Sequence, residues 1–144
     1  MASFVKLNGF VEHLAEKVHN LGSDALTIAL SNTAPGSEGT PPTGATTACV
    51  LANVTQISYT NLSTRVITVS SSAQSGGTYS LVGTDLVLTA SGAVGPFRYV
   101  YLYNDTPTSP ADPLIAYWDY GSSISLATGE TFTIDLASTI LTLG

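Results

Sequence analysis

Apolar and polar residues alternate with a period of two over most of the chain from Arg65 onward. Such alternation predicts β-strands that turn one face toward a core. The turns expected between them fall at residues 71–77 and 92–96, and residues 127–130 suit a tight hairpin. Seven or eight short strands at this spacing predict a mainly β fold, a β-sandwich or a jelly-roll-like set of antiparallel sheets. The expected strands lie at 67–69, 86–88, 97–103, 114–118, 124–126, 132–136 and 140–143.

The run 97–103 carries an aromatic ring at every second position. Successive side chains of a strand point to opposite faces, so these rings share one face, while Val100 and Leu102 share the other. Both faces are then expected to be buried. This pattern is typical of a central strand, or of a strand with one face on a neighbouring subunit. The rings belong to Phe97, Tyr99, Tyr101 and Tyr103.

One amphipathic helix is expected near the N-terminus. Apolar residues recur at helical spacing over residues 9–21, with Asn8 as N-cap and Gly22 just past the C-cap. A first strand follows at 25–31. The helix is expected to pack on the sheet and to form a single domain, 1–144, together with the β-rich body at 65–144.

Residues 33–47 form a Pro- and Gly-rich segment that continues neither helix nor strand. Pro35, Pro41 and Pro42 lie in it. Loops of this length are usually functional or disordered, so two interpretations stay open: an arm that reaches over a neighbouring subunit, or a disordered segment. For an arm, deletion of residues 35–44 should leave the fold intact. Residues 48–57 are compatible with a short helix or a strand.

Charge is sparse in this 144-residue chain, with 10% charged residues and a net charge of −6. Weak electrostatic repulsion favours a large subunit interface or a repetitive assembly. The alternative is a monomer kept in solution by its many Ser and Thr residues. Four Lys and Arg residues are too few for nucleic-acid binding. The sequence also predicts no secretion signal and no membrane span, and therefore synthesis in the cytoplasm.

Candidate catalytic and metal-binding groups are few. On the predicted helix, His13 and His19 lie on different sides, so they are expected at the surface and cannot share a metal. Cys49, the single cysteine, lacks a nearby base and is expected to be a buried thiol. Asp105 and Asp112 flank a Pro-rich loop, where turn capping explains both. We therefore expect no enzyme, no cofactor and no metal site.

Aromatic residues gather again just before Gly121, where Tyr117, Trp118 and Tyr120 offer rings for a sugar-stacking platform. Their alternation between two faces favours a core or an interface instead. The residues expected to contact protein partners are therefore Tyr99, Tyr101, Tyr103, Tyr117, Trp118, Tyr120, Pro35, Pro41 and Pro42.

The last third of the chain resembles small virion proteins of tailed bacteriophages. The similar runs are Tyr-Asn-Asp-Thr at 103–106, Pro-Leu-Ile-Ala-Tyr-Trp-Asp-Tyr-Gly-Ser-Ser-Ile-Ser-Leu at 113–126 and Gly-Glu-Thr-Phe-Thr-Ile-Asp at 129–135. The amphipathic helix and the strand that ends near residues 31–35 are also similar. Members of that family often carry a Gly-containing insertion between the last two strands, whereas residues 137–139 here lead directly into Ile140.

The resemblance implies a part of a virus particle. The expected function is that of a capsid decoration, or cement, protein on the outside of a phage head. Its expected partners are the major capsid protein, whose subunit contacts it would stabilise, and further copies of itself in a trimer. A tail or fibre component and a carbohydrate-binding β-sandwich module are the alternatives.

Overall fold

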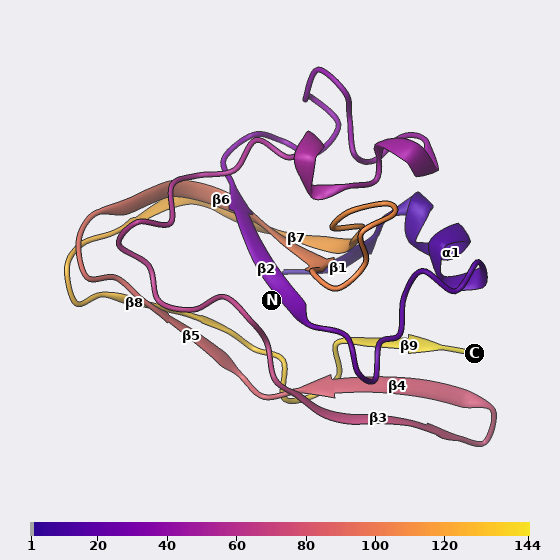
Figure 1. Cartoon of the computed structure of the whole chain (residues 1–144). Helices are drawn as coiled ribbons and strands as arrows, with labels where there is room; N and C mark the ends of the chain where they lie inside the picture. Colours follow the sequence, from indigo (N-terminus) through magenta and orange to yellow (C-terminus); the bar gives the residue numbers. More distant parts are fainter. Residues whose placement is uncertain (1) are drawn as a thin grey trace.

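The computed structural model describes residues 2–144 as a β-sandwich-like fold with antiparallel sheets and, among these residues, one α-helix near the N-terminus (Figure 1). The fold class predicted from the sequence is confirmed. No helix in the described part of the chain is long and apolar enough to cross a membrane.

The first layer is a four-stranded antiparallel sheet in the order β1-β7-β6-β2. Its two central strands are long, β6 (Val94–Asn104) and β7 (Leu114–Leu126), and its two edge strands are short, β1 (Phe4–Lys6) and β2 (Leu26–Ser31). The expected strand at 25–31 is thus confirmed as β2. All six residues of β2 are buried, so both faces of the sheet are covered at this edge.

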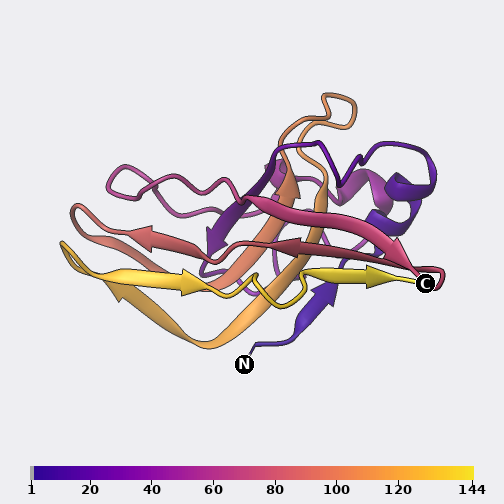
Figure 2. The same cartoon turned by 90° about the horizontal axis from the view of Figure 1, so that it is seen from below.

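The second layer consists of two short sheets that follow one another. One has the order β3-β4-β9, with β3 (Val69–Ser75), β4 (Thr78–Gly83) and β9 (Leu141–Leu143); the other pairs β5 (Leu86–Thr89) with β8 (Thr131–Ile134). Figure 2 shows these five strands lying together on one side of the first sheet. The core lies between the two layers.

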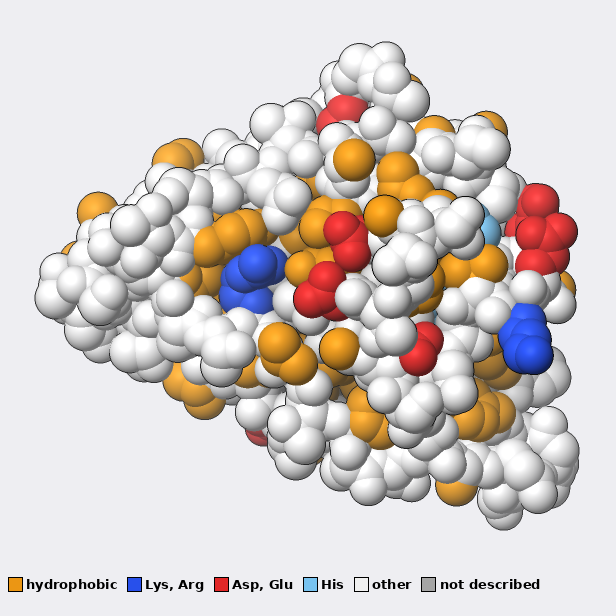
Figure 3. All heavy atoms as spheres, in the orientation of Figure 1, with side chains coloured by type: hydrophobic (Ala, Val, Ile, Leu, Met, Phe, Trp, Pro, Cys, Tyr) orange, Lys and Arg blue, Asp and Glu red, His pale blue; other side chains and the backbone are white. Residues whose placement is uncertain are grey.

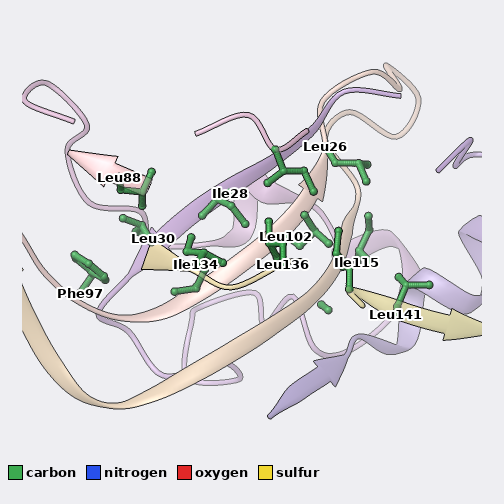
Figure 4. Close-up of a cluster of buried hydrophobic side chains, with 14 of the residues drawn as sticks. Leu26, Ile28, Leu30, Leu88, Phe97, Leu102, Ile115, Ile134, Leu136 and Leu141 are labelled. Carbon is green, nitrogen blue, oxygen red and sulfur yellow. The ribbon is translucent and has the colours of Figure 1, made fainter. Parts of the chain in front are cut away.

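Apolar side chains from both layers meet in this core (Figure 4). Ile28 and Leu102 of the first sheet are fully buried, as are Leu81 and Leu88 of the second layer. Burial of one such side chain contributes about 1.5–3 kcal/mol. The alternating apolar positions of the sequence therefore provide the main driving force for the sandwich.

Strand β6 differs from its prediction at one end. Its tyrosines lie on the face opposite Val100 and Leu102, as expected, but Phe97 packs in the core with these two aliphatic residues. The pairing of β6 with β7 shifts between Phe97 and Tyr99, which is the mark of a β-bulge. A bulge inverts the alternation, so the prediction of four rings on one face is wrong for Phe97.

The helix is shorter than predicted. α1 spans Asn8–Ala15, its N-cap is Leu7, and no side chain caps it. The chain leaves the helix just before Lys17, whose φ of 67° is left-handed. The turns that follow the helix bring Leu21 into the core. Leu21 is therefore apolar because it is buried, although it lies outside the helix.

Two predicted turns are also wrong, and the third, at 92–96, is shorter than predicted because β6 begins at Val94. Residues 71–77 belong largely to β3, whose exposed Ser and Gln side chains carry no apolar alternation, and the turn there is confined to Gly76 and Gly77. Strand β4 was likewise absent from the prediction. Residues 127–130 connect β7 to β8 but form no hairpin, because these two strands do not pair with each other. β7 pairs with β6 in the first layer, and β8 pairs with β5 in the second.

Helix α1 approaches the 3₁₀ helix η1 (Thr46–Ala48) very closely at Gly9. A Cβ atom at Gly9 would lie 2.5 Å from Cys49 Cβ and 3.2 Å from Thr46 Cα. We expect Gly9→Ala to lower the free energy of unfolding by about 1–3 kcal/mol, measured by urea denaturation. Gly39→Ala is the matched control, because its Cβ would meet no atom within 4 Å. Equal stability of the two variants would contradict this close contact.

Candidate contact surface

The tyrosine face of β6, formed by Tyr99, Tyr101 and Tyr103, is covered by the chain itself. Tyr101 is 0% exposed, Tyr103 is 4% exposed and Tyr99 is 8% exposed. They form a second core cluster with Leu7, Ala29, Cys49, Leu51, Val54 and Leu114. This face is therefore not a free surface in the folded chain, and the tyrosines stabilise the fold directly.

The Pro- and Gly-rich segment supplies part of this cover. The hydroxyl of Tyr101 donates a hydrogen bond to Glu38 Oε1 over 3.2 Å, and Glu38 Oε2 accepts the backbone N–H of Gly36 over 2.8 Å. Glu38 and Pro42 are buried, and Pro41 is half-buried. Burial and the Glu38 carboxylate both raise the pKa of the Tyr101 hydroxyl. Residues 33–47, here named the covering arm, thus contact their own sheet through Glu38.

An apolar pocket opens on the core-side face of β7. It has a volume of about 200 Å³, and Trp118 and Tyr120 of β7 and Phe132 of β8 are among its walls. The rings of Tyr120 and Phe132 meet edge to face, with 5.4 Å between their centroids. Tyr120 is 51% exposed, so aromatic surface is presented to solvent at the mouth of this pocket.

A more polar hollow lies on the opposite face of β7. Pro35, Tyr99, Tyr117 and Asp119 are among its walls, and Tyr117 packs on Tyr101 with 5.7 Å between ring centroids. Arg98 clamps Asp119 with two hydrogen bonds of 2.7 and 2.9 Å. The bond from Arg98 lowers the pKa of the Asp119 carboxyl, and the N–H of Gly121 adds to this effect.

The residues predicted to contact partners are thus divided between several places. Trp118 and Tyr120 lie together in the apolar pocket, and Pro35, Tyr99 and Tyr117 lie together in the polar hollow. The alternation of Tyr117, Trp118 and Tyr120 between two faces is as expected. Tyr101, Tyr103 and Pro42 are buried, and Pro41 lies in neither hollow.

Six residues of the apolar pocket wall were not predicted as contact residues, Phe132 and Asp135 among them. Phe132 follows the period-two pattern of its strand, so its apolar position was foreseeable from the sequence. Its position beside Tyr120 was not, because the pairing of β8 with β5 sets it.

The prediction that both histidines lie at the surface is wrong. His13 is 4% exposed, His19 is 7% exposed, and their ring centroids are 6.0 Å apart. The early end of α1 allows this, because His19 lies beyond the helix and packs against Phe10 and His13 of α1. The side-chain amide of Asn104 donates to His19 Nδ1 over 3.2 Å and to Asp24 over 2.6 Å.

This network makes stability depend on pH. Burial, and then His13, lower the pKa of His19 from 6.5 to about 4. The unfolded chain therefore binds a proton below pH 6.5 that the folded chain takes up only near pH 4, so stability is full above pH 6.5 and falls toward pH 4. We expect His19 to contribute a loss of about 3 kcal/mol over this interval.

The measurement is urea denaturation from pH 7 to pH 4, with an NMR titration of the His19 ring. A His19→Gln variant should lose less stability over the same interval than the wild type. A His19 ring that titrates near pH 6.5 in the folded protein would contradict the buried network.

Groups suited to catalysis or metal binding are scarce. No group of three or more His, Cys, Asp and Glu side chains that could hold a metal ion occurs within residues 2–144. Cys49 is 0% exposed, as predicted, and burial raises the pKa of its thiol to about 11, which disfavours the nucleophilic thiolate. In the Pro-rich loop, burial and then Asp105 raise the pKa of Asp112.

Comparison of the chain with protein-family models, with curated proteins and with solved structures finds no match.

Proposed function

We propose that this chain is a structural protein of a tailed-phage particle, a capsid decoration protein that binds the outside of the head and stabilises contacts between major capsid subunits. The observation that carries the proposal is the apolar pocket, where the half-exposed ring of Tyr120 meets Phe132 and Trp118 lies alongside. Half-exposed aromatic residues in a pocket are the anchors on which protein interfaces depend.

The surface supports the same proposal. Figure 3 shows a face on which charged side chains are few and scattered, while uncharged polar and apolar atoms cover most of it. A surface with few charges approaches a shell at little desolvation cost. The resemblance of residues 103–135 to virion proteins is the reason for proposing a phage particle as the binding partner. The covering arm contributes a second contact element, because its Pro35 lies in the wall of the polar hollow.

Weak contacts suffice for this function, because a capsid offers many equivalent sites. Each bound copy adds its binding free energy to the assembled shell, and binding to the assembled state alone stabilises that state by mass action. Self-association as a trimer would let one cluster contact several shell subunits and raise the effective concentration of each contact.

Cosedimentation of the purified protein with separated heads and tails tests the proposal. We expect saturable binding to mature heads and none to tails. Binding to tails alone would contradict the assignment as a capsid decoration protein and would indicate a tail or fibre component. Binding to neither particle would contradict a virion function altogether.

A further inference from the structure

One side of the sandwich is left open between β7 and β8. The opposite side is closed, because Ile28 N–H bonds the carbonyl of Arg65 and Ile67 N–H bonds that of Leu26, each over 2.9 Å. On the open side, β1 pairs with β7 only from Ala116 to Trp118. Among the described residues, no strand continues along that edge of β7, and β8 pairs with β5 alone.

These free edges present unpaired backbone N–H and C=O groups. A row of such groups along a strand is a template for one further strand. In strand addition, backbone hydrogen bonds supply affinity and pockets for alternate side chains supply specificity. Strand β8 offers a free edge because β5 is its one strand partner in the described part of the chain, and it offers alternating positions because Phe132 and Ile134 turn inward to the apolar pocket and the core while Thr131 and Thr133 are exposed.

The size and lining of the apolar pocket restrict its occupant. Its volume is about 200 Å³. An apolar cavity of about 150 Å³ holds benzene, whereas pockets for whole small-molecule ligands begin at about 300 Å³. Among its wall residues, Thr133, Asp135, Tyr120 and Trp118 carry polar side-chain atoms. One apolar or aromatic side chain therefore fits better than a sugar, whose hydroxyls need many hydrogen-bond partners.

Charge restricts the occupant further. Asp135 is the charged residue of the pocket wall, and the ion pair found among the side chains of residues 2–144 is Arg98–Asp119, so none of these side chains is paired with Asp135. The chain as a whole carries a net charge of −6. A partner with Lys or Arg next to its anchoring side chain would therefore be complementary to this wall.

We propose that the open side binds an extended segment of a partner protein. The segment adds as a strand to the free edge of β8, places one apolar or aromatic side chain in the apolar pocket, and sets a Lys or Arg beside Asp135. Under the proposed function the segment belongs to a subunit of the capsid shell. Only this identification of the partner rests on the proposed function.

Selection from a library of random displayed dodecapeptides tests the proposal on the full chain. We expect enriched peptides to share an aromatic or large aliphatic residue with Lys or Arg within two positions. Trp118 is the single tryptophan, and it lines the pocket, so its fluorescence reports the binding of each synthetic peptide directly.

Two variants with a matched control locate the binding. Tyr120→Ala removes an exposed ring and should weaken binding by about tenfold or more, and Asp135→Asn should weaken it by roughly threefold and reduce its salt dependence. Val87→Ala is the control, because Val87 is 49% exposed on β5 and lies outside the pocket. It should bind as the wild type does. A cooperative thermal unfolding transition verifies that each of the three variants folds.

Several results would overturn the inference: no enriched peptide, enrichment that survives Tyr120→Ala, acidic residues beside the anchor, or a Trp118 response to monosaccharides in place of peptides. No virus enters this experiment, so its failure leaves the result of cosedimentation intact. Conversely, peptide binding without binding to heads or tails would remove the virion function and keep the strand-addition site.

Discussion

Tyr101→Ala is expected to lower the free energy of unfolding by about 3–5 kcal/mol. Tyr101 is 0% exposed at the centre of the tyrosine face, between the covering arm and the first sheet. Its removal creates a cavity beneath the arm and leaves Glu38 Oε1 without the hydroxyl that now donates to it. Urea denaturation monitored by Trp118 fluorescence measures the loss.

Two further variants separate the contributions. Tyr101→Phe keeps the ring and removes only the hydrogen bond to Glu38, so it should cost about 1–2 kcal/mol. Tyr120→Ala removes a ring that is 51% exposed and should change stability by about 1 kcal/mol or less. If Tyr101→Ala lowered the free energy of unfolding no more than Tyr120→Ala does, the conclusion that the chain itself covers the tyrosine face would be wrong.

Replacement of residues 35–44 by a Gly-Ser linker of equal length is expected to lower the free energy of unfolding by roughly 2–4 kcal/mol. The replacement removes the buried Glu38 and Pro42 and uncovers part of the tyrosine face. The exposed rings should also bind a hydrophobic dye such as ANS. Thermal unfolding and dye fluorescence together measure both effects.

This expectation differs from the one that the sequence alone supports, in which loss of residues 35–44 leaves the fold intact. The control is Gly39→Ala, which alters the same segment without touching another atom. Unchanged stability and no dye binding by the linker variant would mean that the arm stands free of its own sheet and is available to a neighbouring subunit.

The strands of the core were predictable because burial of one strand face requires apolar side chains at every second position of the sequence. β2 and β6 follow from apolar side chains at every second position, and β9 follows from a short apolar run at the end of the chain. Strand β3 was missed for the opposite reason: its side chains are exposed, so no core imposes a pattern on them. The bulge beside Phe97 was missed because it arises from pairing with β7.

The candidate site was predictable only in part. Aromatic composition indicated Trp118 and Tyr120, but the same signal indicated Tyr101 and Tyr103, which the fold buries. Sequence spacing cannot separate these cases, because the cover comes from an arm some sixty residues earlier in the chain. Similarly, the pairing of His13 with His19 depends on where α1 ends, and the periodicity continues past that point.

The most direct test of the decoration proposal is an electron cryomicroscopy reconstruction of phage heads saturated with the purified protein. We expect ordered density on the outer shell surface where capsid subunits meet, with the open side between β7 and β8 against the shell and Tyr120 at the contact. Heads that carry no such density, or density in which the β7–β8 side faces solvent, would contradict the proposal.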